Sequence, residues 1–96
     1  MNILQLYPKP HPQTAGRIID DEAILMLADD SEINVLNPVG SRIYELANGT
    51  HSVQDIANVL ATEFNVTVGE ATNDVSEFLQ DLVNKNVMVF TEQNEG

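Results

Sequence analysis

The spacing of apolar residues changes once along this chain, at about residue 37, and that change constrains the fold more than any other feature. Before it, apolar residues come in runs of strand length, separated by turns rich in aspartate and serine. After it, they recur about every 3.6 residues, the period of an amphipathic helix. The sequence therefore predicts an α+β domain in which a small sheet precedes a group of helices.

Three runs in the first part are predicted to be strands, at 17–20, 23–28 and 32–36. The run from Ala23 to Ala28 is apolar at every position, so both of its faces should be buried and it should be the central strand. Turns at 20–22 and 29–31 would connect the runs as an antiparallel meander. Residues 32–36 are then expected at an open edge of a three-stranded sheet.

Capping signals mark the starts of three helices. Asn37, Ser52 and Thr67 are residue types that cap helix N-termini, and each precedes a pattern with helical period. Gly49 and Asn86 are suited to ending the first and third helices. Three helices of this size with short turns indicate a winged helix-turn-helix-like domain. The predicted buried faces are Val39, Ile43, Leu46 and Ala47, then Val53, Ile56, Ala57, Leu60 and Phe64, then Ala71, Val75, Phe78, Leu79, Leu82 and Val83.

The ends of the chain are expected to contribute little to the domain. Residues 1–15 are predicted to be an irregular N-terminal arm, because prolines alternate between Tyr7 and Pro12 and favour polyproline II. Such an arm could also be a ligand for a proline-reading domain. Residues 87–90 should either pack on the core or add a strand. The predicted domain is 16–91, followed by a frayed tail at 92–96.

The chain has fifteen acidic residues and only four basic ones, which gives a formal net charge of −11. Nucleic-acid binding places Lys and Arg on phosphates, so this balance excludes a nucleic-acid footprint and also disfavours anionic membranes. A neutral or basic partner is favoured instead. The chain has no cysteine, its first residues do not form a signal peptide, and no apolar run approaches a membrane span of about 18 residues. A cytoplasmic location is expected.

No set of residues typical of catalysis or metal binding is found in the sequence. His11 and His51 lack a second histidine one helical turn away, and no glycine-rich phosphate loop occurs. The acidic turn residues do not have the spacing of a calcium loop, so we interpret them as solvated turn carboxylates. We therefore expect no enzyme activity, no metal and no cofactor. These acidic residues are Asp20, Asp21, Glu22, Asp29, Asp30 and Glu32.

Four acidic residues of the third helix share one narrow stripe. Glu70, Asp74, Glu77 and Asp81 follow the spacing i, i+4, i+7, i+11. Their stripe borders the apolar arc of the same helix. It is either an ordinary solvated face of an acidic protein or the lip of a groove that attracts a basic peptide.

Several segments together resemble the PqqD family of peptide-recognition domains. They are Ile33-Asn-Val-Leu-Asn37, then Val39 to Thr50, then Ser52-Val-Gln-Asp-Ile56, and finally Asp74-Val-Ser-Glu-Phe-Leu-Gln-Asp-Leu-Val83. The family pattern has a strand ending in Leu-Asn, a helix ending in Asp-Gly-Thr, a Ser- or Thr-led second helix, and Asp-Val-x-x-Phe-Leu-x-x-Leu in the third. Asn48 departs from that pattern where the family often has Asp. The resemblance covers about residues 17–90.

This resemblance implies a non-catalytic domain that binds the leader of a ribosomally made precursor peptide. The leader would add as a strand to the sheet edge, lie against the third helix, and be presented to a radical SAM protein or another modifying enzyme. The implied edge is Glu32, Ile33, Asn34, Val35 and Leu36. The implied wall has Val75, Phe78 and Leu82 as anchors and Asp74, Glu77 and Asp81 as its charged lip.

Three alternatives stay open at this point. The anchors, Phe78 above all, could simply be core residues, and the domain could be a winged-helix regulatory or protein-interaction module. An open sheet edge could also pair with a second copy and form a homodimer.

Overall fold

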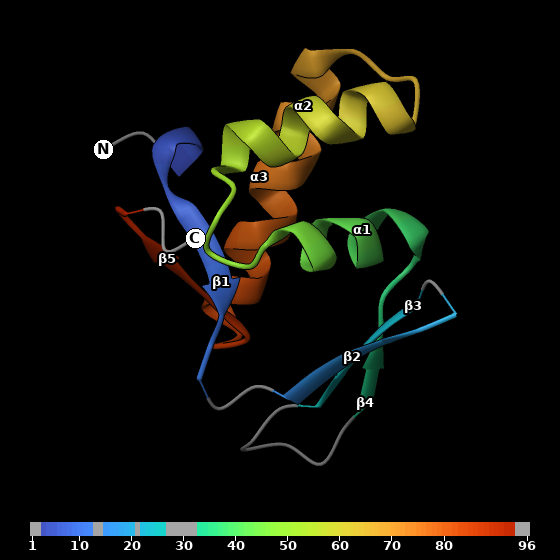
Figure 1. The fold of residues 1–96 in the computed structure, drawn as a ribbon, viewed down its shortest axis with the longest axis vertical. Coiled ribbons are helices and arrows are strands. Elements are labelled where there is room, and N and C mark those ends of the chain that lie inside the picture. Colours follow the sequence, from blue (N-terminus) through green and yellow to red (C-terminus); the bar gives the residue numbers. More distant parts are fainter. Residues whose placement is uncertain (1–2, 13–14, 21, 27–32, 94–96) are drawn as a thin grey trace.

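The computed structural model describes residues 3–12, 15–20, 22–26 and 33–93 and shows an α+β domain with three helices and antiparallel sheets (Figure 1). This confirms the predicted α+β class. The elements in order are a 3₁₀ turn η1 (Ile3–Gln5), β1 (Tyr7–Pro10), β2 (Ala15–Ile19), β3 (Glu22–Met26), β4 (Ile33–Val35), α1 (Pro38–Leu46), α2 (Val53–Glu63), α3 (Val68–Asn84) and β5 (Met88–Thr91).

The strands form two sheets, whereas the sequence predicted one. β2, β3 and β4 are hydrogen-bonded in that order, and β4 takes part through three residues only. β3 is the central strand of these three, as its fully apolar run predicted. β1 and β5 pair with each other in a separate two-stranded sheet that packs beside the C-terminal half of α3 (Figure 1).

The N-terminal segment differs from the irregular arm that we expected. Pro8 and Pro10 lie inside β1, and beyond it the N–H of His11 donates to the Val87 carbonyl at 2.8 Å. Because hydrogen-bonded positions alternate in an antiparallel pair, both prolines fall where the backbone nitrogen faces away from β5. The Pro8 carbonyl accepts instead from the Gly49 N–H at 2.9 Å. The alternating prolines are therefore compatible with a strand at this particular register.

The helix boundaries follow the predicted capping signals. The side-chain oxygens of Asn37, Ser52 and Thr67 each accept from the backbone N–H three residues later, at 2.7, 3.0 and 3.1 Å. Gly49 and Asn86 adopt the left-handed conformation, with φ of 87° and 62°. Each N-cap oxygen satisfies a backbone donor that the helix itself cannot pair.

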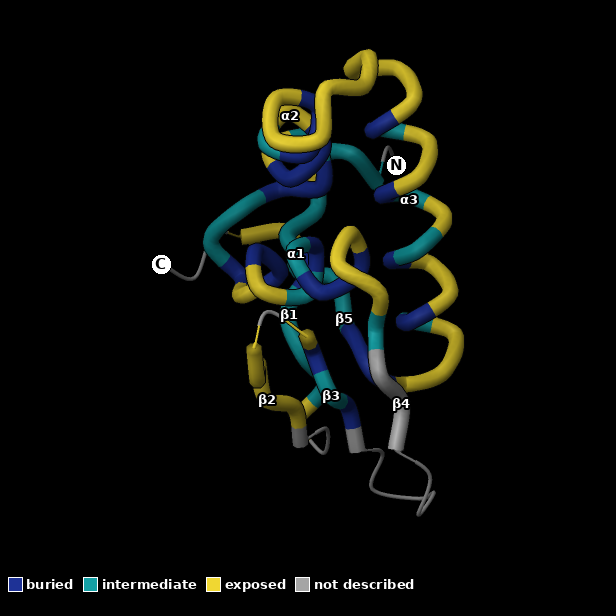
Figure 2. The backbone as a smooth tube through the Cα atoms, turned by 90° about the vertical axis from the view of Figure 1, so that its right-hand side faces the viewer, coloured by how far each residue is buried: buried dark blue, intermediate teal, exposed yellow. Residues whose placement is uncertain are grey.

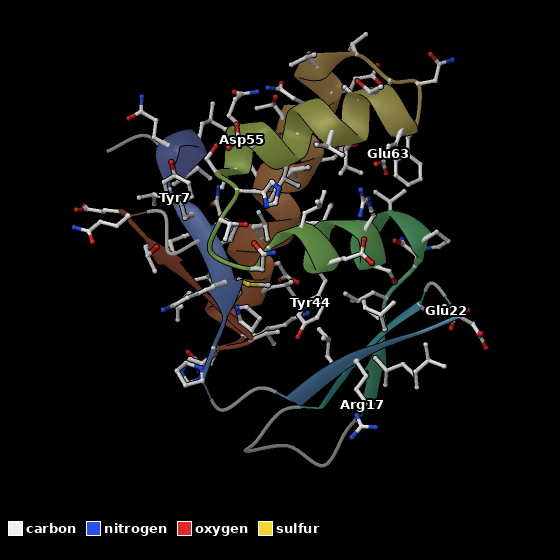
Figure 3. All side chains as sticks on the ribbon, viewed as in Figure 1. Tyr7, Arg17, Glu22, Tyr44, Asp55 and Glu63 are labelled. Carbon is white, nitrogen blue, oxygen red and sulfur yellow. The ribbon has the colours of Figure 1, made fainter. Side chains whose placement is uncertain are left out.

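The core lies between the three helices, the inner face of β3 and β5. Figure 2 shows the buried side of each helix turned toward the middle of the molecule. Tyr44 points from α1 toward the β2–β3–β4 sheet, where its hydroxyl lies against Gly16 (Figure 3). Two predicted core residues are exposed instead: Val39 by 39% and Phe64 by 38%. The largest fully buried side chains are Leu25, Ile43, Ile56, Leu79, Met88, Val53, Val75 and Pro8.

Within the described ranges, no helix combines the length and the apolar character that crossing a membrane requires.

Candidate functional site

The outer edge of β4 is the first component of the candidate site. β4 is the last strand of the order β2–β3–β4, and no other described strand pairs with its outer side. An unpaired edge presents a row of backbone N–H and C=O groups to any extended chain that approaches it. The predicted edge strand is therefore an edge strand in the structure.

The register of β4 identifies which of its backbone groups face outward. Asn34 pairs with Leu25, and the Leu36 N–H donates to the Ala23 carbonyl at 2.8 Å. Hydrogen-bonded and outward-facing residues alternate along an antiparallel strand. The N–H and C=O groups of Ile33 and Val35 consequently point away from β3.

Helix α3 is the second component of the site. Figure 2 shows α3 along the side of the molecule opposite β2, which is also the β4 side of the sheet. Phe78 of α3 lies against the first turn of α1, directly after β4. A Cβ at Gly40 would lie 3.1 Å from both Cε1 and Cζ of the Phe78 ring and 3.1 Å from Asn37 Oδ1. The absence of a side chain at Gly40 thus allows this close approach.

The three predicted anchors differ in exposure. Val75 and Leu82 are 1% and 5% exposed and belong to the core, whereas Phe78 is half-buried and packs on the edge of that core. Leu36, which follows β4, is also half-buried against the core. Among the predicted anchors, Phe78 is therefore the side chain that a ligand could contact directly.

The predicted charged lip is exposed. Asp74, Glu77 and Asp81 all face solvent, and Asp81 forms an ion pair with Lys85 at 2.9 Å. At about 100° per residue, this acidic stripe lies beside the apolar face of α3, on the side of that face where Phe78 lies. Both side chains of the Asp81–Lys85 pair are about 60% exposed, so the pair adds little to stability. Glu32, the remaining predicted site residue, lies outside the described residues.

Glu63 at the end of α2 and Tyr44 of α1 have shifted pKa values. Arg42 of α1 donates to both carboxylate oxygens of Glu63 at the end of α2, at 2.9 and 2.8 Å, and also pairs with Glu45. The hydrogen bond from Arg42 lowers the pKa of Glu63. Burial raises the pKa of the Tyr44 phenol. The Arg42–Glu63 ion pair links α1 to α2.

A hollow of about 220 Å³ lies beside this ion pair, between β2, α1 and the end of α2. Its lining includes Ile18, Arg42 and Phe64 and none of the predicted peptide-binding residues. Among the described residues, no three His, Cys, Asp or Glu side chains are grouped so that they could hold a metal ion. Within the described ranges, the β4 edge presents outward-facing backbone groups, and α3 presents the partly exposed Phe78 ring.

Sequence reasoning missed two residues of the site, Gly40 and Ser41. Gly40 allows Phe78 to reach α1, and the Ser41 hydroxyl bonds to the backbone at the end of β4. The sequence signal that could have identified them is the pair of small residues in the first turn of a helix. An isolated glycine at such a position can indicate a close contact with another element.

The comparisons with known proteins agree with this geometry. The family model described as coenzyme PQQ synthesis protein D (PqqD) matches residues 22–88, more than half of the chain. The matched region contains β3, β4 and all three helices. A search of curated proteins finds no match.

Two solved structures are similar in fold. The first is TbiB1 in complex with the TbiA(beta) leader peptide, with a TM-score of 0.76 and 28% identity over 83% of this chain and 93% of that chain. The second is lasso peptide synthetase B1 complexed with the leader peptide, with a TM-score of 0.77 and 20% identity over 86% of this chain and 98% of that chain. At 20% identity the second likeness concerns the fold alone.

Proposed function

The chain belongs to the PqqD family, and on this premise we propose that it is a non-catalytic module that binds the leader of a ribosomally made precursor peptide. The leader adds as an extended strand to the outer edge of β4 and lies against α3. Backbone hydrogen bonds provide affinity in this mode, and neighbouring side chains provide specificity. The bound peptide is then presented to a modifying enzyme.

The observation that carries this proposal is the open edge of β4 on the α3 side of the sheet. Ile33 and Val35 direct backbone donors and acceptors outward, and Phe78 supplies an apolar surface nearby. The leader-peptide complex of TbiB1, at 28% identity, supports the same reading.

The proposed contacts follow from where each site residue lies. The outward-facing backbone groups of Ile33 and Val35 pair with the leader, and Phe78 and Leu36 provide apolar contact. Val75 and Leu82 do not contact the leader; they are buried and pack α3 against the core. Asp74, Glu77 and Asp81 favour basic residues in the leader.

The proposal also includes a second protein partner and a cellular location. We propose a radical SAM protein or another modifying enzyme as the second partner, and a cytoplasmic location fits a chain without cysteine. We propose that the three helices with the β2–β3–β4 sheet form a winged helix-turn-helix-like unit, which the element order supports. The net charge of −11 disfavours DNA as its ligand and also disfavours a second copy on the same edge.

A proline at position 35 tests strand addition. Val35→Pro removes an outward-facing donor and adds a ring at the proposed pairing position, while the pairing with β3 uses the neighbouring residues. We expect affinity for a synthetic candidate leader peptide to fall about tenfold or more, measured by calorimetric titration.

Gln54→Ala serves as the control for this experiment. Gln54 lies on α2, where its amide reaches Asn58 and Thr72, away from β4. Equal losses of affinity in the two variants would count against strand addition. Failure of the wild-type protein to bind the leader at all would count against the function itself.

A further inference from the structure

A side chain is inserted into the hydrogen-bond ladder where β4 ends. The pairs Ile24–Val35 and Leu25–Asn34 make Ala23 and Leu36 the next pair along the two strands. The Leu36 N–H donates to the Ala23 carbonyl at 2.8 Å, as this pairing requires. In a regular ladder the Ala23 N–H would donate back to the Leu36 carbonyl.

The Ser41 hydroxyl takes the place of that second hydrogen bond. Its Oγ accepts from the Ala23 N–H at 2.7 Å and donates to the Leu36 carbonyl at 3.1 Å. Ser41 is 3% exposed and Ala23 is 0% exposed, so water does not readily replace the hydroxyl. One serine of α1 therefore occupies one position of the ladder and bonds to the backbone of both strands.

The residue next to Ser41 contacts the opposite wall of the site. Gly40 lies against the Phe78 ring of α3, and Ser41 bonds to the backbone at the end of β4. Both belong to the first turn of α1, which begins at the Asn37 cap. A single rigid helical turn is thus in contact with α3 on one side and with β4 on the other.

The contacts of this helical turn with α3 and β4 matter because a strand added to β4 must lie at a fixed distance from it. A strand that pairs with β4 must lie about 4.8 Å from it while its side chains fit against α3. A displacement of β4 by even part of an ångström therefore changes the fit on both sides of the bound chain.

We propose that Ser41 is a positioning residue for peptide binding: by bridging Ala23 and Leu36, it fixes the end of β4 at the distance from α3 that an added strand requires. This inference rests on the proposed function. Removal of the hydroxyl leaves two backbone groups unpaired unless the strands move to pair them, so the end of β4 loses the bond that fixes its position.

Ser41→Ala tests this role, with Ser52→Ala as the matched control. Ser52 is the other described buried serine, 9% exposed, and its hydroxyl caps α2. We expect Ser41→Ala to lower affinity for the same candidate leader peptide about fivefold. Ser52→Ala should lose stability through its cap and keep its affinity within about twofold.

Spectra of the free protein provide a readout that does not depend on the ligand. In Ser41→Ala, we expect NMR shifts at the amides of 33–37 and at the Phe78 ring, whereas Ser52→Ala should leave both unchanged. If Ser41→Ala does not fold, Ser41→Cys keeps a weaker donor and acceptor of similar size and should show the same shifts with a smaller loss of affinity.

Three outcomes would overturn the role of Ser41: wild-type affinity in the folded Ser41→Ala variant, equal losses in Ser41→Ala and Ser52→Ala, or no change at Phe78 and 33–37 in the free protein. If the wild-type protein fails to bind the leader, the proposed function fails, and the free-protein spectra still decide whether Ser41 positions β4.

Discussion

At the scale of single residues, the site depends on two small side chains in the first turn of α1. Gly40 leaves room for the Phe78 ring, and Ser41 supplies the hydroxyl between β3 and β4. Neither residue offers much surface to a ligand, since both are buried. They influence binding through the position of their neighbours, Phe78 and Leu36.

Gly40→Ala should impair binding through the Phe78 ring. The new Cβ would lie 3.1 Å from two ring atoms, closer than ordinary contact, so the ring must move. Overpacking of this kind typically costs about 1–3 kcal/mol. We expect leader affinity to fall about threefold to tenfold, measured by calorimetric titration.

Gly69→Ala is the matched control for Gly40→Ala. Gly69 lies in the first turn of α3, where the nearest atom to an added Cβ is Thr67 Oγ1 at 4.0 Å. This change should raise the free energy of unfolding by about 0.5–1 kcal/mol and leave affinity unchanged. Unchanged affinity in Gly40→Ala would show that the ring position is irrelevant to binding.

The sequence predicted residue roles well where the signal is local. Asn37, Ser52 and Thr67 cap the three helices as expected, because an N-cap depends only on the next three residues. Ser41 was missed because its two partners, Ala23 and Leu36, are brought to it by the fold. Periodicity on α3 also grouped Val75 and Leu82 with Phe78, although only packing determines which of them stays partly exposed.

At the scale of elements, the helices are tied together by few polar contacts. Arg42 of α1 pairs with Glu63 of α2, with the two side chains 33% and 40% exposed. Arg42 is the middle residue of α1 and directly follows Ser41. It helps to hold α1 against α2.

Removal of the Glu63 charge should destabilise the fold in a pH-dependent way. Arg42 lowers the pKa of Glu63, so the stabilisation is present above the ordinary glutamate pKa of about 4.3 and is lost as pH falls through the lowered value. We expect Glu63→Gln to be less stable than wild type at pH 7, with the difference vanishing at strongly acidic pH.

Urea denaturation across a pH series measures this difference. Glu77→Gln, at an exposed carboxylate of α3 outside the ion pair, is the control and should show no comparable loss at pH 7. A Glu63→Gln deficit that is constant with pH would contradict an ionic origin.

Element boundaries after residue 37 were largely predictable, and the N-terminal strand was not. The alternating prolines of 7–12 usually indicate polyproline II, and β1 becomes possible only because β5 supplies a partner more than 70 residues later. The same long-range pairing forms a second sheet, β1–β5, in addition to the single sheet that was expected. Phe64 was assigned to the core by period, but it lies at the end of α2 and is exposed there.

At the scale of the whole molecule, charge is the dominant property. Of the four basic residues, Arg42 and Lys85 are paired with carboxylates in the structure. The remaining two, Lys9 and Arg17, lie on strands of different sheets. The described surface therefore offers no cluster of cations to a polyanion, which agrees with a neutral or basic ligand.

Salt should stabilise the free protein. At a net charge of −11 the acidic groups repel one another, and the Debye length falls from about 30 Å at 0.01 M salt to about 8 Å at 0.15 M. We expect Tm to rise by about 2–4 °C over this range, equivalent to roughly half a kcal/mol. A Tm that falls with salt would indicate that attractive ion pairs dominate.

Amide hydrogen exchange along β4, with and without the leader, tests the central claim most directly. In the free protein, the N–H groups of Ile33 and Val35 face outward and should exchange faster than that of Leu36, which bonds to Ala23. Leader binding should protect Ile33 and Val35 specifically, because the added strand accepts from them. Saturating leader that leaves both amides unprotected would contradict strand addition at β4.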